Sequence, residues 1–363
     1  MKIGIDIGGS HIAVGVINEY NQIISKKEHN WTELEKIDLD KNIEIYSKKF
    51  INDFLEDKSN KIEKIGIGYP NKNIINGIIY KDEKKVNLTE IIFKEFNIPT
   101  YLKNDVKCSA MCEKTLGNLN EYDNCIFITL GTGIGGAYFY KNKLVVPNKY
   151  QGFEVGHMVI EVDGRKCKCG QNGCFEEYAS MKTFRKEIAE LFNLESINSY
   201  TMFEILETKQ KYDEVEKIID RYINYLSVGL SNIINIFEPD AICIGGSFTY
   251  YAPIFMDKLK HRIQEVFKGR DIPELLTAKF ENDAGIIGAS MLNSNWVKES
   301  NCRLWEGGPK VVWPFWVPHA NLQTTIYYLL QFLTYIAISL TNRNLYSIII
   351  NSDYQNVVKK RFN

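Results

Sequence analysis

Apolar residues occupy every second position at the start of the chain. They are Ile3, Ile5, Ile7, Ile12, Val14 and Val16. A period of two is typical of β-strands with one buried face. The segment between the two runs, Gly8-Gly9-Ser10, is rich in turn-forming residues. The chain is therefore predicted to open with a β-hairpin made of residues 3–7 and 12–17.

A second hairpin is predicted about one domain length later. Residues 125–130 and 137–146 have the composition of strands, and Gly131-Thr132-Gly133-Ile134-Gly135-Gly136 joins them. Glycine pairs occur in the turns of both hairpins. This similarity predicts an internal duplication that gives two similar lobes.

Helical spacing of apolar residues predicts helices over residues 40–57, 105–117, 213–237 and 284–292. Buried strands are predicted over residues 65–70, in a segment that ends at Tyr101-Leu102, and over 241–246 together with its glycine turn. The last helix contains Gly285, Gly288 and Ala289, and these small residues predict a close approach to a neighbouring element.

Length and composition indicate a globular chain of about two domains. It has 363 residues, 45% of them apolar, with 44 basic and 45 acidic residues and a formal net charge of -1. The net charge therefore gives no electrostatic field that would favour the binding of nucleic acid. Asp6 interrupts the N-terminal apolar run, which argues against a signal peptide and makes the cytoplasm the expected location.

The patterns divide the chain into four parts. These are an N-terminal small lobe over residues 1–117, a large lobe over 118–280, a closing helix over 281–295 and a C-terminal extension over 296–363. The extension contains four of the five tryptophans and has no Asp, Glu, Lys or Arg between Lys310 and Arg343. Its apolar run, residues 326–340, is shorter than the ~20 residues that span a bilayer comfortably, so a packed or poorly ordered extension is favoured over a membrane tether.

One histidine and three cysteines have the spacing of a zinc site. They are His157, Cys167, Cys169 and Cys174. Reduced thiols or a disulfide are the alternatives, but Cys-x-Cys is cramped for a disulfide and three of the eight cysteines gather beside one histidine. Four protein ligands leave no open position, so the predicted zinc is structural. The acidic pair Glu176-Glu177 follows and would be held in place by the metal loop.

The two glycine turns are candidate phosphate sites. The second matches G-x-G-x-x-G, but a dinucleotide fingerprint must run into a helix, whereas the residues after this turn have the composition of a strand. What remains are two turns, at Gly8, Gly9 and Ser10 and at Gly131, Thr132 and Gly133, whose bare backbone amides can approach one polyphosphate. Either turn alone could be mere hairpin geometry.

Two aspartates complete the parts that phosphoryl transfer requires. Asp6 ends the first strand and could position Mg²⁺ through water, unless it is simply a surface residue. Asp105 is a candidate base for a hydroxyl proton, and the plainer alternative is that it caps the following helix.

With these residues in view, residues 1 to about 293 resemble the ROK family of bacterial sugar kinases and sugar-responsive repressors. Similar motifs are found in Ile5 through Ser10, in Leu130 through Gly136, and from Gly156-His157 through Cys174 and Glu176 to Ser180. The resemblance implies an actin and hexokinase-like α/β fold in which two lobes close on the substrate. It also implies ATP, Mg²⁺ and a structural Zn²⁺, allows a homodimer, and places the nucleotide base near Gly245-Gly246.

By the same resemblance, Asp105 is the base toward the 6-hydroxyl of a hexose, most simply glucose. Residues implied to hold the other hydroxyls are Asn104, Glu154, His157 and Glu176. The chain departs from the family pattern at Asn71, after the turn at Pro70, and in the run Lys103-Asn104-Asp105-Val106-Lys107, where the family usually has Glu-Asn-Asp-Ala-Asn. Both departures flank the implied sugar pocket, so the choice of hexose stays open, with N-acetylmannosamine as the alternative.

Two other classes of function compete with a kinase. A sugar-sensing repressor needs a helix-turn-helix before the first strand, which here begins at Ile3. A catalytically weak regulator would use the tryptophan-rich extension to bind a partner or a membrane.

Overall fold

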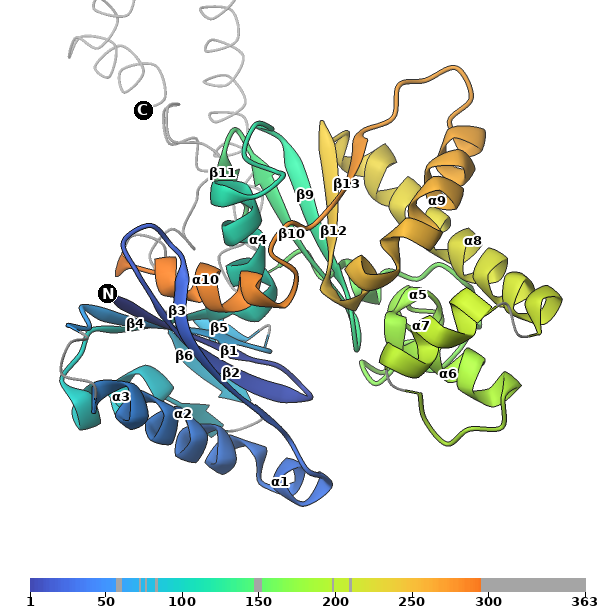
Figure 1. The fold of residues 1–363 in the computed structure, drawn as a ribbon. Coiled ribbons are helices and arrows are strands. Elements are labelled where there is room, and N and C mark those ends of the chain that lie inside the picture. The colour runs from blue at the N-terminus through green and yellow to red at the C-terminus, as the bar shows by residue number, and fades with distance from the viewer. Residues whose placement is uncertain are drawn as a thin grey trace, which may run out of the picture. The chain divides into compact units, whose positions relative to one another are not determined.

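The computed structural model describes residues 1–56, 61–71, 73–75, 77–81, 84–146, 152–197, 199–208 and 211–294 (Figure 1). All of them lie in the first of the two units, residues 1–302 and 303–363, into which the chain divides. The extension predicted over 296–363, with its apolar run, lies outside the described residues.

A mixed five-stranded sheet forms the core of the N-terminal lobe, in the order β3-β2-β1-β4-β8. The strands are β1 (Lys2–Ile7), β2 (His11–Ile17), β3 (Ile23–Asn30), β4 (Lys64–Tyr69) and β8 (Thr100–Asn104). β1 and β2 form the predicted hairpin, with Ile7 opposite Ile12. β4 and β8 extend the sheet in parallel. Between β4 and β8 along the chain, a separate three-stranded sheet is formed by β5 (Ile74–Ile75), β6 (Ile78–Lys81) and β7 (Lys84–Val86).

The second lobe repeats this arrangement in the order β11-β10-β9-β12-β13. Its strands are β9 (Cys125–Leu130), β10 (Ile134–Tyr140), β11 (Lys143–Leu144), β12 (Ala241–Gly245) and β13 (Glu274–Thr277). The pairs β9–β10 and β10–β11 are antiparallel, and β9–β12 and β12–β13 are parallel, as at the corresponding places of the first sheet. The internal duplication predicted from the paired turns is confirmed at the level of topology.

Ten α-helices and three short 3-10 helices are described. The α-helices are α1 (Glu33–Ile37), α2 (Leu39–Leu55), α3 (Leu88–Phe96), α4 (Asp105–Leu116), α5 (Glu176–Ala179), α6 (Met181–Leu191), α7 (Ser199–Thr208), α8 (Tyr212–Phe237), α9 (Ala252–Val266) and α10 (Ala284–Met291), and the 3-10 helices are η1 (Val155–His157), η2 (Gly246–Tyr251) and η3 (Glu281–Asp283).

The outer face of each sheet is covered by helices with an apolar stripe. In the first lobe Phe50 and Ile51 of α2 pack with Ile5 of β1. In the second lobe Leu226 of α8 and Phe255 of α9 share a core cluster with the second sheet. Burial of these stripes is the main favourable term that holds helices on sheets.

The inner faces are covered by α10 and α4, which also pack on each other (Figure 1). α10 lies so close to the first sheet that a Cβ on Gly4 would be 1.9 Å from the carbonyl oxygen of Ile286. Ala110 of α4 shares a cluster with Phe127 of the second sheet, although α4 falls within the predicted N-terminal lobe. The small residues predicted to give α10 a close contact do so, since a Cβ on Gly288 would be 1.8 Å from the carbonyl oxygen of Cys108.

The second hairpin differs from its prediction in two ways. Its second strand begins at Ile134 and not at residue 137, because Gly135 and Gly136 pair with β9 and lie inside β10. The predicted single strand over 137–146 is also wrong: Lys141 and Asn142 both have a positive φ and turn the chain between β10 and β11. Their left-handed conformation is typical of a two-residue hairpin turn.

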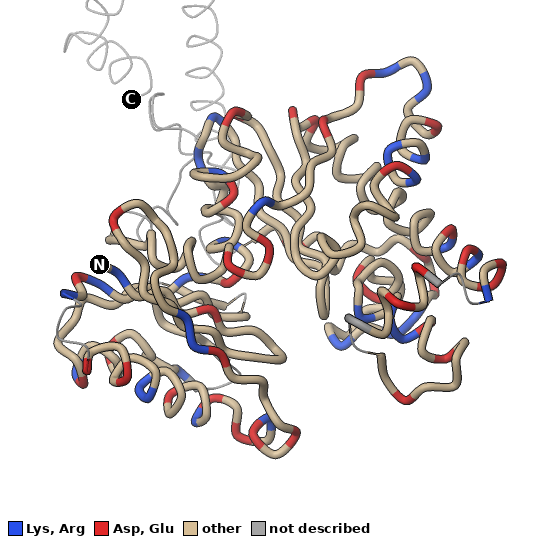
Figure 2. The backbone as a smooth tube through the Cα atoms, in the orientation of Figure 1, with Lys and Arg blue, Asp and Glu red and all other residues tan. Residues whose placement is uncertain are grey.

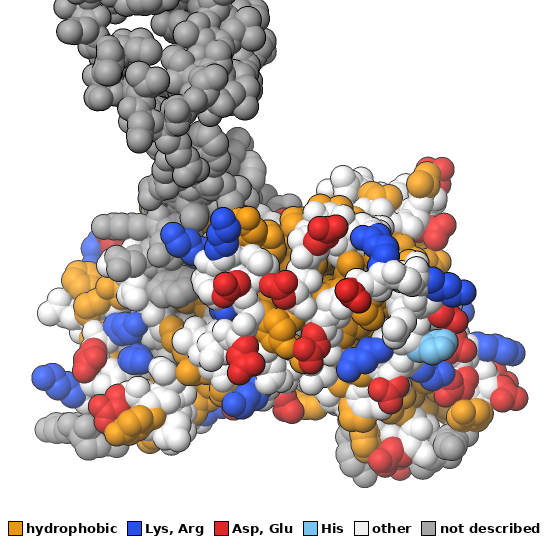
Figure 3. Space-filling view, turned by 90° about the horizontal axis from the view of Figure 1, so that it is seen from above, with side chains coloured by type: hydrophobic (Ala, Val, Ile, Leu, Met, Phe, Trp, Pro, Cys, Tyr) orange, Lys and Arg blue, Asp and Glu red, His pale blue; other side chains and the backbone are white. Residues whose placement is uncertain are grey.

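Charged residues are interspersed along the outer helices α2, α8 and α9 (Figure 2). The face shown in Figure 3 likewise carries side chains of both signs. Among the helices of the described residues, none combines the length and the apolar character needed to cross a membrane.

Candidate active site and metal centre

Asp6 and Asp105 lie at the same edge of the first sheet. β1, β4 and β8 are parallel, so their carboxyl ends meet there, and Asp6 is opposite Gly68 of β4. A Cβ on Gly68 would lie 3.3 Å from Cα of Asp105 and 3.5 Å from Oδ1 of Asp6. The absence of a side chain at Gly68 therefore lets the two aspartates share one site.

Burial shifts the ionisation of both carboxyl groups. It raises the pKa of Asp6 to about 7, with a further rise from the charge of Asp105 and an opposing effect of Lys26. Burial likewise raises the pKa of Asp105 to about 6, against the lowering effect of hydrogen bonds from the backbone at Val106 and at Asp105 itself. A carboxylate whose pKa lies near neutrality is suited to accept a proton from a hydroxyl.

Asp105 is the first residue of α4, and Asn104 is its N-cap. The side chain of Asn104 accepts a hydrogen bond from the amide of Lys107 at 3.2 Å and donates one to Oδ1 of Asp105 at 2.9 Å. The alternative that Asp105 serves merely as the helix cap is therefore wrong. Its carboxylate is held by Asn104 at the positive end of the helix.

The first glycine turn is supported by an aromatic residue that the sequence analysis missed. The indole Nε1 of Trp31 donates to the carbonyl of Gly8 at 3.1 Å, and its amide donates to the carbonyl of Ser10 at 2.9 Å. A Cβ on Gly9 would meet no atom within 4 Å. The fold itself therefore leaves open space beside Gly9. Trp31 is the single tryptophan outside the extension, a signal that could have drawn attention to it.

The second turn also leaves open space beside a glycine, Gly131. Its amide donates to the carbonyl of Gly133 at 3.0 Å, and a Cβ on Gly131 would meet nothing within 4 Å. The turn ends β9, and because β12 runs parallel to β9, Gly245 and Gly246 lie at the same sheet edge. Gly246 has φ +73, and a Cβ there would be 2.6 Å from the carbonyl oxygen of Leu130, so the fold requires glycine at this position.

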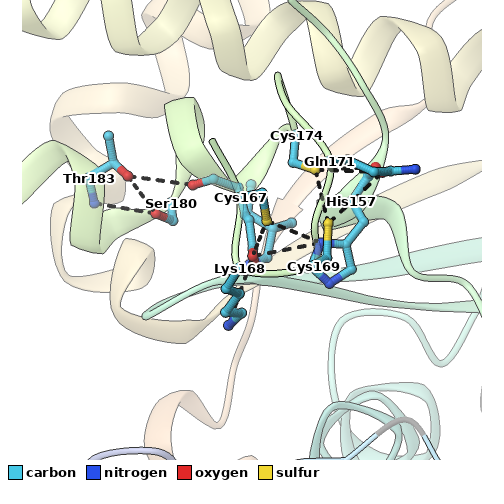
Figure 4. A network of polar contacts seen from close by, with 10 residues as sticks. His157, Cys167, Lys168, Cys169, Gln171, Cys174, Ser180 and Thr183 are labelled. Carbon is cyan, nitrogen blue, oxygen red and sulfur yellow. Dashed lines mark hydrogen bonds and ion pairs between the residues drawn. The ribbon is translucent and has the colours of Figure 1, made fainter. Parts of the chain in front are cut away.

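The four predicted metal ligands converge in a loop before α5 (Figure 4). Their ligand atoms all lie within 4.8 Å of one another. Nδ1 of His157 is 3.7 Å from Sγ of Cys167, and the Sγ atoms of Cys169 and Cys174 are 3.5 Å apart. A tetrahedron with zinc–sulfur bonds of ~2.3 Å has edges of about 3.8 Å, so these separations fit the ion. Left-handed Gly170 and Gly173 turn the chain between the ligands.

Glu176 joins the metal cluster to the second turn. Its Oε1 lies 3.4 Å from Sγ of Cys167 and 3.7 Å from Nδ1 of His157. Its Oε2 accepts from the amide of Ile134 at 3.5 Å, and a Cβ on Gly133 would lie 2.5 Å from that oxygen. Glu176 is buried, with 8% of the residue exposed, and its carboxylate contacts both the metal loop and the turn.

Glu154 precedes η1, and His157 ends that helix. The charge of Glu154 acts on Asp105, where it raises the pKa. The structure thus brings Asp6, Asp105 and Glu154 into electrostatic contact, while His157 and Glu176 belong to the metal cluster. A second residue that the sequence analysis did not assign, Lys107, is buried next to Asp105 and Glu154.

Comparison with known proteins gives one consistent result over the described part of the chain. The model of the ROK family matches residues 2–295. The glucokinase of Thermotoga maritima is 26% identical over 312 residues, which cover 80% of this chain and 96% of that protein. The beta-glucoside kinase of Listeria monocytogenes is 32% identical over 294 residues, with 80% and 96% covered.

A repressor and a solved kinase structure are also similar to the chain. The xylose repressor of Bacillus spizizenii is 28% identical over 324 residues, which cover 80% of this chain and 76% of the repressor. The crystal structure of a ROK family glucokinase from Streptomyces griseus in complex with glucose and AMPPNP superposes with a TM-score of 0.66 at 24% identity, covering 80% of this chain and 97% of that one. This structural likeness shows a common fold, and the hexokinase-like α/β architecture expected from the sequence is confirmed.

Proposed function

Since the chain belongs to the ROK family, we propose that it is an ATP-dependent kinase that transfers the γ-phosphoryl group to the 6-hydroxyl of a hexose, with glucose as the first candidate. The observation that carries the proposal is the position of Asp105. Its carboxylate stands at the N-terminus of α4, is oriented by Asn104 and has a pKa raised to about 6. Such a group can be ionised at neutral pH and still accept a proton effectively.

In the proposed reaction the sugar hydroxyl oxygen forms the new bond to the γ-phosphorus while the bond to the β-phosphate oxygen breaks. Asp105 accepts the hydroxyl proton as the new oxygen–phosphorus bond forms. Because the reaction relies on positioning, the residues around the hydroxyl matter as much as the base. Asn104, Glu154, His157 and Glu176 are proposed to hold the remaining hydroxyls of the hexose.

The two glycine turns are proposed to hold the phosphates of ATP. Support comes from Gly9 and Gly131, where neither a protein atom nor a left-handed φ accounts for the glycine. A ligand that approaches the backbone closely would account for both. Asp6 would position Mg²⁺, which when bound neutralises charge on the phosphates. Thr132 and Ser10 would add hydroxyl groups, and Gly245-Gly246 would lie near the nucleotide base.

The cluster of His157, Cys167, Cys169 and Cys174 is proposed to hold a structural Zn²⁺. The donor set and its separations fit the ion, and all four positions of a tetrahedron would be filled by the protein. In that arrangement the metal would fix the loop before α5 and with it Glu176. Nδ1 is the His157 atom that faces the thiols, which leaves Nε2 for a sugar hydroxyl.

The test is the rate of phosphorylation of a sugar panel by the purified protein with ATP. Glucose, N-acetylmannosamine, fructose and allose would be compared, together with a beta-glucoside because of the similarity to the Listeria kinase. Asp105→Asn is expected to lower turnover by at least ~100-fold while sugar binding survives. Asp213→Asn, which alters an exposed aspartate in the first turn of α8, is the matched control and should retain full activity.

Near wild-type turnover in Asp105→Asn would refute the assigned base. Faster phosphorylation of N-acetylmannosamine than of glucose would favour the alternative substrate. A protein that binds sugar but phosphorylates none of the panel would favour the repressor-like branch of the family.

A further inference from the structure

Lys107 is a buried cation two residues after Asp105. The residue is 2% exposed, and its side chain reaches from α4 to the second lobe. Its ammonium donates to the carbonyl oxygen of Gly136 in β10 and, at 2.9 Å, to the carbonyl oxygen of Gly152. A charged donor buried in this way needs such partners, because an unpaired ammonium would be expensive to desolvate.

The segment that Lys107 holds has a strained backbone. Gly152 has φ +67 and Phe153 has φ +58, which places two consecutive residues in the left-handed region. Phenylalanine is rarely found there, so the surroundings must hold the conformation. The ring of Phe153 stacks on Tyr138 with centroids 5.9 Å apart, and the ammonium of Lys107 lies 5.9 Å from the Phe153 centroid.

The next residue along the chain is Glu154, proposed above to hold a sugar hydroxyl. The charge of Lys107 acts on both Glu154 and Asp105. We infer that Lys107 is a positioning residue, whose bonds to Gly136 and Gly152 fix Glu154 relative to Asp105 and so set the affinity for the sugar. The inference rests on the proposed kinase function, and it concerns a position where the family usually has asparagine.

The same lysine also affects the electrostatics of the base. Burial lowers the pKa of Lys107 to about 8, against the charges of Glu154 and Asp105, which raise it, while Lys103 lowers it further. The ammonium of Lys107 lowers the pKa of Asp105, and Glu154 raises it. Asp6 also interacts electrostatically with Asp105, and the buried thiol of Cys108 lies in the field of Asp6, Lys103 and Asp105. Loss of the Lys107 charge should therefore make Asp105 harder to ionise.

Three variants of the full-length protein separate these effects. Lys107→Met removes the charge and the hydrogen bonds at similar volume, and Lys107→Gln removes the charge but keeps an amide donor. Lys114→Met is the matched control, because Lys114 is a second buried lysine of α4 that also donates to two carbonyl oxygens, those of Leu119 and Asn120.

The first readout does not depend on activity. Hydrogen exchange followed by mass spectrometry should show faster exchange over residues 152–158 in Lys107→Met than in the wild type. In Lys114→Met these residues should exchange at the wild-type rate. Unchanged exchange over 152–158 in Lys107→Met would overturn the positioning role, whether or not the protein proves to be a kinase.

The second readout is steady-state kinetics on the best sugar of the panel. Lys107→Met should raise the KM for the sugar by about 10-fold or more, with the KM for ATP within about 2-fold of the wild-type value. The acid limb of the kcat/KM profile should move to higher pH by roughly half a unit to one unit in both Lys107 variants, because the ammonium no longer favours the Asp105 carboxylate.

The two readouts distinguish the ways in which the ideas can fail. If the wild type phosphorylates no sugar but exchange over 152–158 responds as expected, the proposed function falls and the structural role of Lys107 stands. If the wild type is active and Lys107→Met changes neither the sugar KM nor the acid limb, the inference is wrong. If Lys107→Met does not fold, the kcat/KM profile of Lys107→Gln is the deciding measurement. An acid limb at the same pH as in the wild type would then count against the inference.

Discussion

At the scale of single residues, the first lobe concentrates negative charge where burial opposes it. Asp6 and Asp105 share one sheet edge, and the pKa of each is raised mainly by burial. Gly285 of α10 closes the same place, since a Cβ there would lie 2.4 Å from the Asp6 carboxylate. Groups held in this way lower the stability of the fold and are characteristic of functional sites.

Asp6→Asn should therefore stabilise the protein in a pH-dependent manner. The folded state prefers protonated Asp6, so its contribution to stability is complete below the ordinary pKa of ~4 and is lost as pH rises through about 7. Between pH 4.5 and 7.5, the advantage of the variant over the wild type in unfolding free energy should grow by about 2 kcal/mol. This is roughly half of what three pKa units would give, because the Asp6 residue retains some exposure to solvent, which screens its charge.

Denaturant titrations at several pH values, without added Mg²⁺, would measure this gain. Asp213→Asn is again the control, and its difference from the wild type should be flat with pH. A flat difference for Asp6→Asn would contradict the assigned ionisation.

Gly131→Ala should separate ligand binding from folding. The added Cβ meets no protein atom within 4 Å, so the unfolding free energy should stay within about 0.5 kcal/mol of the wild-type value. If the turn holds a phosphate, the same methyl group should raise the KM for ATP by about 10-fold or more. An unchanged KM for ATP would remove the second turn from the proposed site.

At the scale of elements, α10 is positioned by the absence of side chains. A Cβ on Gly66 would be 1.7 Å from the carbonyl oxygen of Ala289, and one on Gly288 would be 1.8 Å from that of Cys108. These contacts bring the helix against β4 on one side and α4 on the other. Glycine has a low helix propensity, which destabilises α10, and the close packing that glycine permits must offset this loss.

Gly288→Ala should consequently destabilise the fold even though alanine favours helices. Helix propensity alone predicts that the unfolding free energy rises by about 1 kcal/mol. The shift needed to make room for the added methyl group should lower it by about 3 kcal/mol, so overpacking decides the sign. Thermal unfolding of Gly288→Ala and of Gly131→Ala, the glycine with open space, would compare the two cases. Stabilisation by Gly288→Ala would show that α10 can move away from α4.

The metal loop is an element whose stability should depend on its ion. Purified protein is expected to contain about one zinc per chain, and Cys174→Ser should lose both the zinc and, in unfolding free energy, on the order of several kcal/mol. Cys243→Ala, at a buried cysteine of β12 away from the cluster, should retain the zinc. Elemental analysis decides the content, and a metal-free wild type of full stability would exclude a structural zinc.

At the scale of the whole molecule, the described residues include the helices that cover both sheets. The inner faces of both sheets are covered by α4 and α10, and the family match ends at residue 295, just beyond α10. A shorter chain with these helices retains every described core cluster. The catalytically weak regulator, which would act through the extension, can be tested on this basis.

A chain that ends at residue 295 should fold and phosphorylate sugar at the rate of the full-length protein. A chain that ends at residue 283 lacks α10, exposes the inner face of the first sheet and should fail to fold cooperatively. Circular dichroism melts and activity measurements on both would test this. Loss of activity in the longer of the two chains would assign a function to residues 296–363.

The core of the fold was predictable because its signals are local. Alternating isoleucines and valines identify β1 and β2, and the apolar stripe of α8 predicts that helix to within one residue. The start of β10 was not predictable, because glycine gives no periodicity and only pairing of Gly135 with Thr129 places it in the strand. The sequence left open whether Asp105 caps α4, and the structure decides this because β8 ends at Asn104, which becomes the N-cap.

The sequence by itself determined the two similar hairpins, the set of metal ligands and the two aspartates at strand ends, because residues that lie close together in the chain carry these patterns. Tertiary structure alone decided that Trp31 supports the first turn, that Gly68 and Gly285 surround Asp6, and that Lys107 reaches Gly136 and Gly152. These contacts join residues far apart in the chain. They depend on how closely backbones approach, which no local pattern of side chains records.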